Sequence, residues 1–122
     1  MPHILIIDDD ATMRDVLFEM MDLEGYTAMV AENGLAAQKL IEINHFDCII
    51  TDIVMPEKEG LETILYITKN RPDTPIIAIS GGARIKPESY LDMALQFGAR
   101  FAFEKPFVRK DLIAAVKKCL ET

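Results

Sequence analysis

The chain has 122 residues and a formal net charge of −7 at pH 7, with 50% hydrophobic and 27% charged residues. This composition excludes an intrinsically disordered chain and fits one folded domain over residues 1–122. The acidic balance argues against direct binding to nucleic acid, which needs a cationic surface. No apolar stretch is long enough to span a membrane, and we expect no signal peptide, so the predicted location is the cytoplasm.

Five short apolar runs are predicted to be strands, and a helical pattern follows each of them. In chain order, the expected strands occupy residues 3–7, 26–30, 47–51, 75–79 and 100–104. The helical patterns cover residues 13–23, 34–43, 60–68, 90–97 and 112–120. This alternation predicts an α/β three-layer sandwich, in which helices cover both faces of a parallel sheet. Five strands favour the flavodoxin-like doubly wound order 2-1-3-4-5.

Charged and hydroxyl side chains stand where the expected strands end. Asp8 and Asp9 follow the first strand, and Asp52 follows the third. Ser80 follows the fourth strand and Lys105 the fifth. In an open parallel sheet, the binding site lies outside the carboxyl ends of the strands, where the winding reverses. The sequence therefore predicts a site at this edge that brings the five residues together.

The chemistry of these residue types points to phosphoryl transfer. Three neighbouring carboxylates repel one another unless a cation compensates their charge, and Mg²⁺ or Mn²⁺ suits such oxygen ligands. Lys105 adds a positive charge and Ser80 a hydroxyl donor, and both suit phosphate oxygens. A metal, a lysine and a carboxylate nucleophile are the parts that phosphoryl transfer needs, and aspartate is a known covalent acceptor. We therefore expect Asp52 to be phosphorylated.

Four motifs stand in the order of a known family. They are IIDD with Asp8 and Asp9, IITDIVMP with Asp52, AIS with Ser80, and EKPF with Lys105. Over its whole length the chain resembles the CheY-like receiver domain of bacterial response regulators. The resemblance implies a two-component phosphorelay, in which a phosphohistidine of a sensor kinase or phosphotransfer domain donates the phosphoryl group.

The resemblance also implies a metal-binding set. Asp9 and Asp52 would bind Mg²⁺ directly, together with the backbone carbonyl of Val54. Asp8 would bind the ion directly or through water. The metal site and the phosphorylation site would therefore share one carboxylate.

Ser80 and Lys105 would bind the phosphoryl oxygens in the active state, and the Lys105–Pro106 bond is a candidate for a cis peptide. Phosphorylation would bias the surface of the fourth helix, fifth strand and fifth helix towards an unknown output partner or a phosphorylation-dependent dimer. The protein would catalyse its own phosphorylation and dephosphorylation but act mainly as a signalling switch.

The predicted switch region departs from the family pattern. Ala102 stands where the family usually has an aromatic residue that rotates inward. Phe101 and Phe103 are expected on the opposite face of their strand. The segment GGARIKPESY, which begins with Gly81 and Gly82, is expected to be an extended loop. We expect a rearrangement of this loop, instead of a ring rotation, to transmit the switch.

Two positions tune the lifetime of the phosphoaspartate in this family. Here they are Val54 and Gly82. Because neither side chain can position an attacking water, slow self-dephosphorylation is expected.

Two other functions fit part of the pattern. ILIIDDDAT matches the DxDxT opening of haloacid-dehalogenase-type phosphatases, with Asp8 as nucleophile and Asp10 as acid/base. Ser80 and Lys105 could then be the second and third motifs, but a further acidic pair is missing and Asp52 has no role. A degenerate receiver that only binds a partner is disfavoured because no phosphorylation residue is missing.

Cys48 and Cys119 have neither a CxxC nor a Cys/His spacing. We expect them to be small buried or half-buried thiols in a reducing compartment. The sequence assigns them no function.

Overall fold

A computed structural model describes residues 1–53, 59–81 and 87–121 of the chain. Its strands form one parallel sheet in the order β2-β1-β3-β4-β5. The strands are β1 (His3–Ile7), β2 (Thr27–Ala31), β3 (Cys48–Asp52), β4 (Ile76–Ser80) and β5 (Phe101–Glu104). The predicted fold class and strand order are confirmed.

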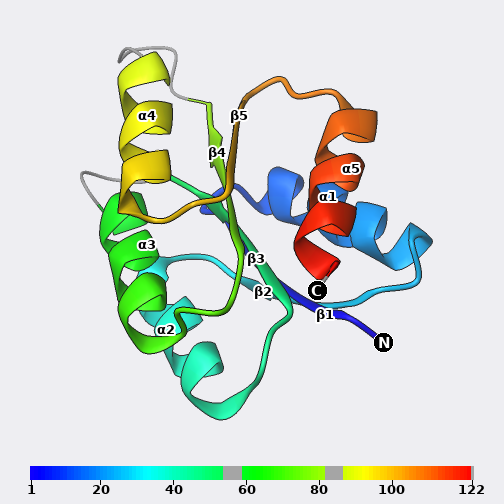
Figure 1. The fold of residues 1–122 in the computed structure, drawn as a ribbon. Helices are drawn as coiled ribbons and strands as arrows, with labels where there is room; N and C mark the ends of the chain where they lie inside the picture. The colour runs from blue at the N-terminus through cyan, green and yellow to red at the C-terminus, as the bar shows by residue number, and fades with distance from the viewer. Residues whose placement is uncertain (54–58, 82–86, 122) are drawn as a thin grey trace.

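Helices cover both faces of this sheet. They are α1 (Ala11–Leu23), α2 (Gly34–Ile43), α3 (Glu59–Asn70), α4 (Pro87–Phe97) and α5 (Arg109–Leu120). Figure 1 shows α1 and α5 on one face and α2, α3 and α4 on the other. Each face has its own apolar core, and we call the core under α1 and α5 the α1/α5 core.

The central strands are buried because helices lie above and below them. Every residue of β3 and β4 is buried, including Asp52 and Ser80 at their ends. Alternate residues of β3 enter opposite cores, since Ile49 packs under α2 and α3 while Cys48 and Ile50 pack in the α1/α5 core. Burial of each large apolar side chain contributes about 1.5–3 kcal/mol. This packing holds the ends of the strands in fixed positions.

Local signals set the boundaries of the first two helices. The Asp10 carboxylate caps α1 by accepting a hydrogen bond of 2.9 Å from the amide of Thr12. The Asn33 side chain caps α2 in the same way, through the amide of Ala36 at 2.8 Å. Gly25 follows α1 with a φ of 84°, a left-handed conformation that glycine adopts without steric cost.

Two boundaries differ from the sequence-based expectation. The strands after β1 begin one residue later than predicted, so Asp52 and Ser80 are the last residues of β3 and β4. The extended loop predicted for GGARIKPESY is wrong at its end, because α4 begins at Pro87. Proline favours the first position of a helix, where its fixed φ fits and its missing amide costs nothing. Residues 82–86 of that segment lie outside the described part of the chain.

Candidate functional site

Three carboxylates meet where β1 and β3 end. Ile7 of β1 pairs with Thr51 of β3, so Asp8 and Asp52 follow at adjacent positions of the sheet edge. Asp8 is 1% exposed and Asp52 5%. Asp9 is exposed, and its carboxylate completes a group whose ligand atoms all lie within 4.8 Å of one another. The sheet thus brings together the acidic residues that the sequence singled out.

Lys105 extends into this acidic cluster from the end of β5. Its Nζ lies 3.1 Å from Oδ2 of Asp8 and 3.3 Å from Oδ2 of Asp52. Burial lowers the pKa of Lys105, but the negative charges of Asp52 and Asp8 and their hydrogen bonds outweigh burial and raise it. The Lys105–Pro106 peptide bond is cis. Lys105 is therefore a protonated donor beside the buried carboxylates at neutral pH.

The loop that holds the acidic residues is fixed by short hydrogen bonds. The backbone amide of Asp10 donates to Oδ1 of Asp8 at 2.9 Å. Arg14, one turn into α1, donates from Nη1 to the backbone carbonyl of Asp8 at 2.8 Å. The sequence pattern did not single out Arg14. Its position on the helix that directly follows the acidic triplet is the signal that could have identified it.

The Ser80 hydroxyl is buried at the same edge. Ser80 is fully buried, and its Oγ has no hydrogen-bond partner among the described residues. A buried polar atom without a partner costs about 1–3 kcal/mol, so native structures keep few of them. The backbone carbonyl of Ser80 accepts a hydrogen bond of 2.7 Å from the amide of Lys105, which ties the ends of β4 and β5 together. An anion bound beside Lys105 would give this hydroxyl an acceptor.

The donor set fits a hard divalent cation. Asp8, Asp9 and Asp52 offer carboxylate oxygens, which are the ligands that Mg²⁺ prefers. The single charge of Lys105 balances at most one of these three carboxylates. The remaining negative charge favours a divalent cation at this edge.

Some of the expected residues lie beyond what the structure describes. Val54, with the carbonyl expected to bind the metal, and Gly82 fall outside the described residues. Gly81 is described and exposed, and a Cβ placed on it would lie 2.6 Å from Cδ of Lys105. The backbone at Gly81 therefore packs against the lysine side chain.

Ala102 and its neighbours lie on opposite faces of β5. Ala102 packs against the core under α2, α3 and α4. Phe101 and Phe103 pack in the α1/α5 core, as the strand alternation predicts. Because both rings lie on the other face of β5, neither replaces the aromatic side chain that the family usually has at the position of Ala102.

Comparisons with known proteins agree with this geometry. A family model described as "Response regulator receiver domain" matches residues 4–117. The transcriptional regulatory protein CpxR of Klebsiella pneumoniae is 31% identical over 122 residues, which cover 98% of this chain and 50% of CpxR. This chain thus spans about half the length of that curated relative.

Solved receiver structures share the whole fold. A CheY-like receiver domain protein from Methanospirillum hungatei is 29% identical, with a TM-score of 0.88 over 99% of this chain and 94% of that chain. The response regulator TrrA of Thermotoga maritima, solved in complex with Mg²⁺ and BeF, is 32% identical with a TM-score of 0.83. That match covers 98% of this chain and 100% of TrrA. Within the described residues, no helix has both the length and the apolar character that a membrane span requires.

Proposed function

Because this chain belongs to the response regulator receiver domain family, we propose that Asp52 accepts a phosphoryl group from a phosphohistidine of a sensor kinase. The observation that supports this most is the position of Asp52. It accepts a hydrogen bond from the Lys105 ammonium group, as Asp8 does, and it belongs to the acidic cluster. A buried carboxylate is costly unless its charge is compensated, and here that compensation lies at the carboxyl edge of the strands, where open α/β sheets bind their ligands.

The proposed reaction transfers the phosphoryl group from nitrogen to oxygen. A carboxylate oxygen of Asp52 attacks phosphorus, a new O–P bond forms and the N–P bond breaks. The histidine imidazole leaves with its electron pair and takes a proton from solvent. Lys105 and Ser80 donate hydrogen bonds to the phosphoryl oxygens, where negative charge gathers in the transition state.

Metal binding belongs to the same proposal. We assign Asp9, Asp52 and the backbone carbonyl of Val54 as direct ligands of Mg²⁺ or Mn²⁺, with Asp8 as a direct or water-mediated ligand. When bound, the ion would neutralise charge on the carboxylates and on the incoming phosphoryl group. The similar Thermotoga protein was solved in complex with Mg²⁺ and BeF, which supports Mg²⁺ as the ion.

We further propose that phosphorylation changes the surface of α4, β5 and α5. Lys105 joins β5 to the segment before α5, and its amide is bonded to Ser80 at the end of β4. A shift of Ser80 and Lys105 towards a phosphoryl group would therefore move the ends of both strands. α4 packs on β4 and β5, so it would move with them.

The partners follow from this assignment. We propose a single receiver domain over residues 1–122, a cytoplasmic location, and a sensor kinase or phosphotransfer domain as donor. The output partner is a further domain, another protein or a second copy of this chain. Since the net charge is −7, we assign no direct nucleic-acid binding to this chain.

Acetyl phosphate and Mg²⁺ provide the first test. The phosphorylated protein is reduced with borohydride, which traps an acyl phosphate, and the modified residue is identified by mass spectrometry. The expected label is on Asp52, and it should disappear with a chelator and in Asp52→Asn. Asp10→Asn is the matched control, because asparagine keeps the α1 cap.

Other outcomes would contradict the proposal. A label on Asp8, or turnover of acetyl phosphate that survives Asp52→Asn and stops in Asp10→Asn, would favour a phosphatase of the haloacid-dehalogenase type. No label from acetyl phosphate and none from a phosphorylated histidine phosphotransfer domain would leave a degenerate receiver that only binds partners.

A further inference from the structure

The two cysteines of the chain contact each other, although they are distant in sequence. Cys48 is the first residue of β3, and Cys119 lies in the last turn of α5. Both pack in the α1/α5 core, and their thiols are hydrogen-bonded. Both are free thiols in the structure. Two thiols that interact within one core are the starting arrangement for a disulfide, whose formation requires their Cα atoms to lie within about 7 Å of each other.

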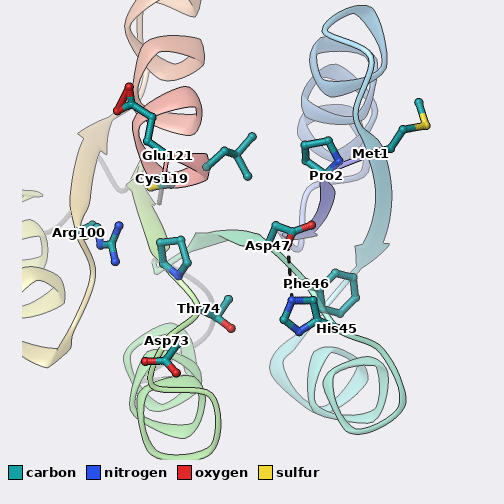
Figure 2. Close-up of a pocket in the computed structure, with 12 residues that line it drawn as sticks. Met1, Pro2, His45, Phe46, Asp47, Asp73, Thr74, Arg100, Cys119 and Glu121 are labelled. Atoms are coloured by element: carbon teal, nitrogen blue, oxygen red, sulfur yellow. Dashed lines mark ion pairs between the residues drawn. The ribbon is translucent and has the colours of Figure 1, made fainter.

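The two thiols differ in their access to solvent. Both cysteines are buried, Cys48 with 0% and Cys119 with 6% exposure, but Cys119 also lines an open cavity of about 640 Å³ at the amino-terminal edge of the sheet. Figure 2 shows this cavity, with Arg100 beside β5 and Cys119 and Glu121 at the end of α5. It lies at the edge opposite the acidic cluster. A small oxidant in this cavity would therefore be nearer to Cys119 than to Cys48, which does not line it.

The charge distribution favours the same thiol. The hydrogen bond from Cys48 lowers the pKa of Cys119, burial opposes this, and the positive charge of Arg100 lowers it further. The same hydrogen bond and burial raise the pKa of Cys48. Cys119 therefore ionises more readily than Cys48 and is the more reactive of the two thiols towards an oxidant.

We propose that Cys119 and Cys48 form a peroxide-sensitive dithiol, with Cys119 as the reacting sulfur and Cys48 as the resolving one. The Cys119 thiolate attacks one oxygen of a hydroperoxide, the O–O bond breaks, and an alcohol or water leaves after taking a proton from solvent. Cys119 becomes a sulfenic acid. The Cys48 sulfur then attacks the Cys119 sulfur, and the disulfide forms with release of water. The two thiols are oxidised and the peroxide is reduced.

The proposed disulfide would link two elements that the phosphoryl site also uses. Cys48 begins the strand that ends at Asp52, and Cys119 belongs to the helix that follows Lys105. The reaction itself needs neither Mg²⁺ nor a phosphoryl donor. Its failure is therefore distinguishable from a failure of the phosphoacceptor proposal.

The test treats the folded chain with hydrogen peroxide, without Mg²⁺ or a phosphoryl donor, and maps its peptides under non-reducing conditions. We expect a mass loss that corresponds to the two thiol hydrogens, and one linked peptide pair that contains Cys48 and Cys119. In Cys48→Ser, a sulfenic-acid probe such as dimedone should label Cys119. In Cys119→Ser, Cys48 should stay unmodified while the protein is folded.

A variant without the positive charge of Arg100 tests whether that charge, and not only the packing of the two thiols, affects the rate of disulfide formation. Arg100→Met should slow disulfide formation several-fold, because it removes the positive charge that helps to lower the pKa of Cys119. Lys118→Met is the matched control, since Lys118 is an exposed neighbour that does not line the cavity. Circular dichroism of each variant shows whether it is folded.

Three results would overturn the proposal. One is a folded protein in which both thiols resist peroxide and react only after denaturation. Another is oxidation of Cys119 to the sulfinic acid while Cys48 remains reduced. The third is a disulfide that joins two chains instead of Cys48 and Cys119 of one chain.

Discussion

The ammonium group of Lys105 lies 3.3 Å from a carboxylate oxygen of Asp52. The Lys105 side chain is 18% exposed and that of Asp52 is 5% exposed, so water screens the pair only in part. The same ammonium group lies 3.1 Å from Asp8. A phosphoryl group on Asp52 would offer this donor oxygens with more charge than a carboxylate. The contact therefore stabilises the unphosphorylated site and places the lysine for the phosphorylated one.

Replacing Lys105 with methionine should destabilise the metal-free protein. The change leaves the buried carboxylates of Asp8 and Asp52 without their ammonium partner. Loss of one partner from a fully buried ion pair costs about 3–5 kcal/mol, and partial exposure of Lys105 reduces this to about 1–3 kcal/mol. Urea unfolding with a chelator present measures the difference. Lys110→Met, at an exposed position of α5, should be nearly neutral.

The contribution of Lys105 to the stability of the folded protein should be lost at alkaline pH. Because the carboxylates raise its pKa above the ordinary 10.5, the folded state holds the proton more tightly than the unfolded chain. The contribution is fully present below pH 10.5 and is lost as the pH rises through the folded-state pKa. The free-energy difference between wild type and Lys105→Met should thus be constant from neutral pH and shrink above pH 10.5. A difference that stays unchanged there would contradict an ionic origin.

Asp9→Asn should weaken Mg²⁺ binding more than Asp10→Asn. Asp9 belongs to the acidic cluster, whereas Asp10 accepts the capping bond from Thr12. Mg²⁺ at a hundred times its dissociation constant should add about 2.7 kcal/mol to the stability of the wild type. Thermal unfolding against Mg²⁺ concentration measures this. The dissociation constant should rise at least about tenfold in Asp9→Asn, a loss of about 1.4 kcal/mol, and equal effects of both variants would refute the ligand assignment.

Ser80→Ala should separate stability from phosphorylation. The Ser80 hydroxyl is buried without a hydrogen-bond partner among the described residues, so its removal should leave the unphosphorylated protein unchanged or more stable by about 1 kcal/mol. Phosphoryl transfer from acetyl phosphate should slow, because one donor to the phosphoryl oxygens is gone. Ser80→Thr keeps the hydroxyl and should retain more of the rate. A clear loss of stability in Ser80→Ala would show that the hydroxyl already has a partner.

The sheet and the acidic cluster were predictable because they depend on strand order and strand ends. Each apolar run has strand length, and parallel strands place the residues beyond their carboxyl ends at one edge of the sheet. Asp8, Asp52 and Lys105 therefore meet for a reason that can be deduced from sequence alone. The apolar face of α1 was less predictable, since Val16 and Leu23 fit the helical spacing yet are 44% and 62% exposed. Met21 is buried in their place.

The contacts that the sequence did not reveal depend on how α1 and α5 pack. The bond from Arg14 to the Asp8 carbonyl requires the exact direction of α1 relative to β1. The contact between Cys48 and Cys119 requires the final turn of α5 to lie over the start of β3. Neither contact can be recognised from the spacing of residues in the sequence. Each depends on the angle at which a helix packs against a strand.

The phosphoryl group on Asp52 should be lost slowly. Val54 and Gly82 have no side-chain group that can hold a water for attack on phosphorus. After removal of acetyl phosphate, the phosphorylated fraction can be followed by mass spectrometry. Val54→Asn should shorten the lifetime because a carboxamide can position water, while Val54→Ala should not. A wild-type half-life of only seconds would refute this expectation.

Phosphorylation should change amide hydrogen exchange across residues 81–90. Gly81 packs against the Lys105 side chain, and the Lys105 amide is bonded to the Ser80 carbonyl. Since Ala102 has no ring to rotate, we expect the backbone after Ser80 to take up the movement of Lys105 towards the phosphoryl group. Peptides that cover residues 81–90 should therefore change their exchange rate with acetyl phosphate and Mg²⁺.

The control for this measurement lies within the same chain. The helix α2 packs on β1 and β2, whereas Lys105 follows β5 on the other side of the sheet. Peptides from α2 should therefore keep their exchange rates. Asp52→Asn should show no change in residues 81–90 under the same conditions, because it cannot form the phosphoaspartate. Unchanged exchange in the phosphorylated wild type would mean that the backbone after Ser80 does not transmit the switch. The movement would then have to pass through β5 alone.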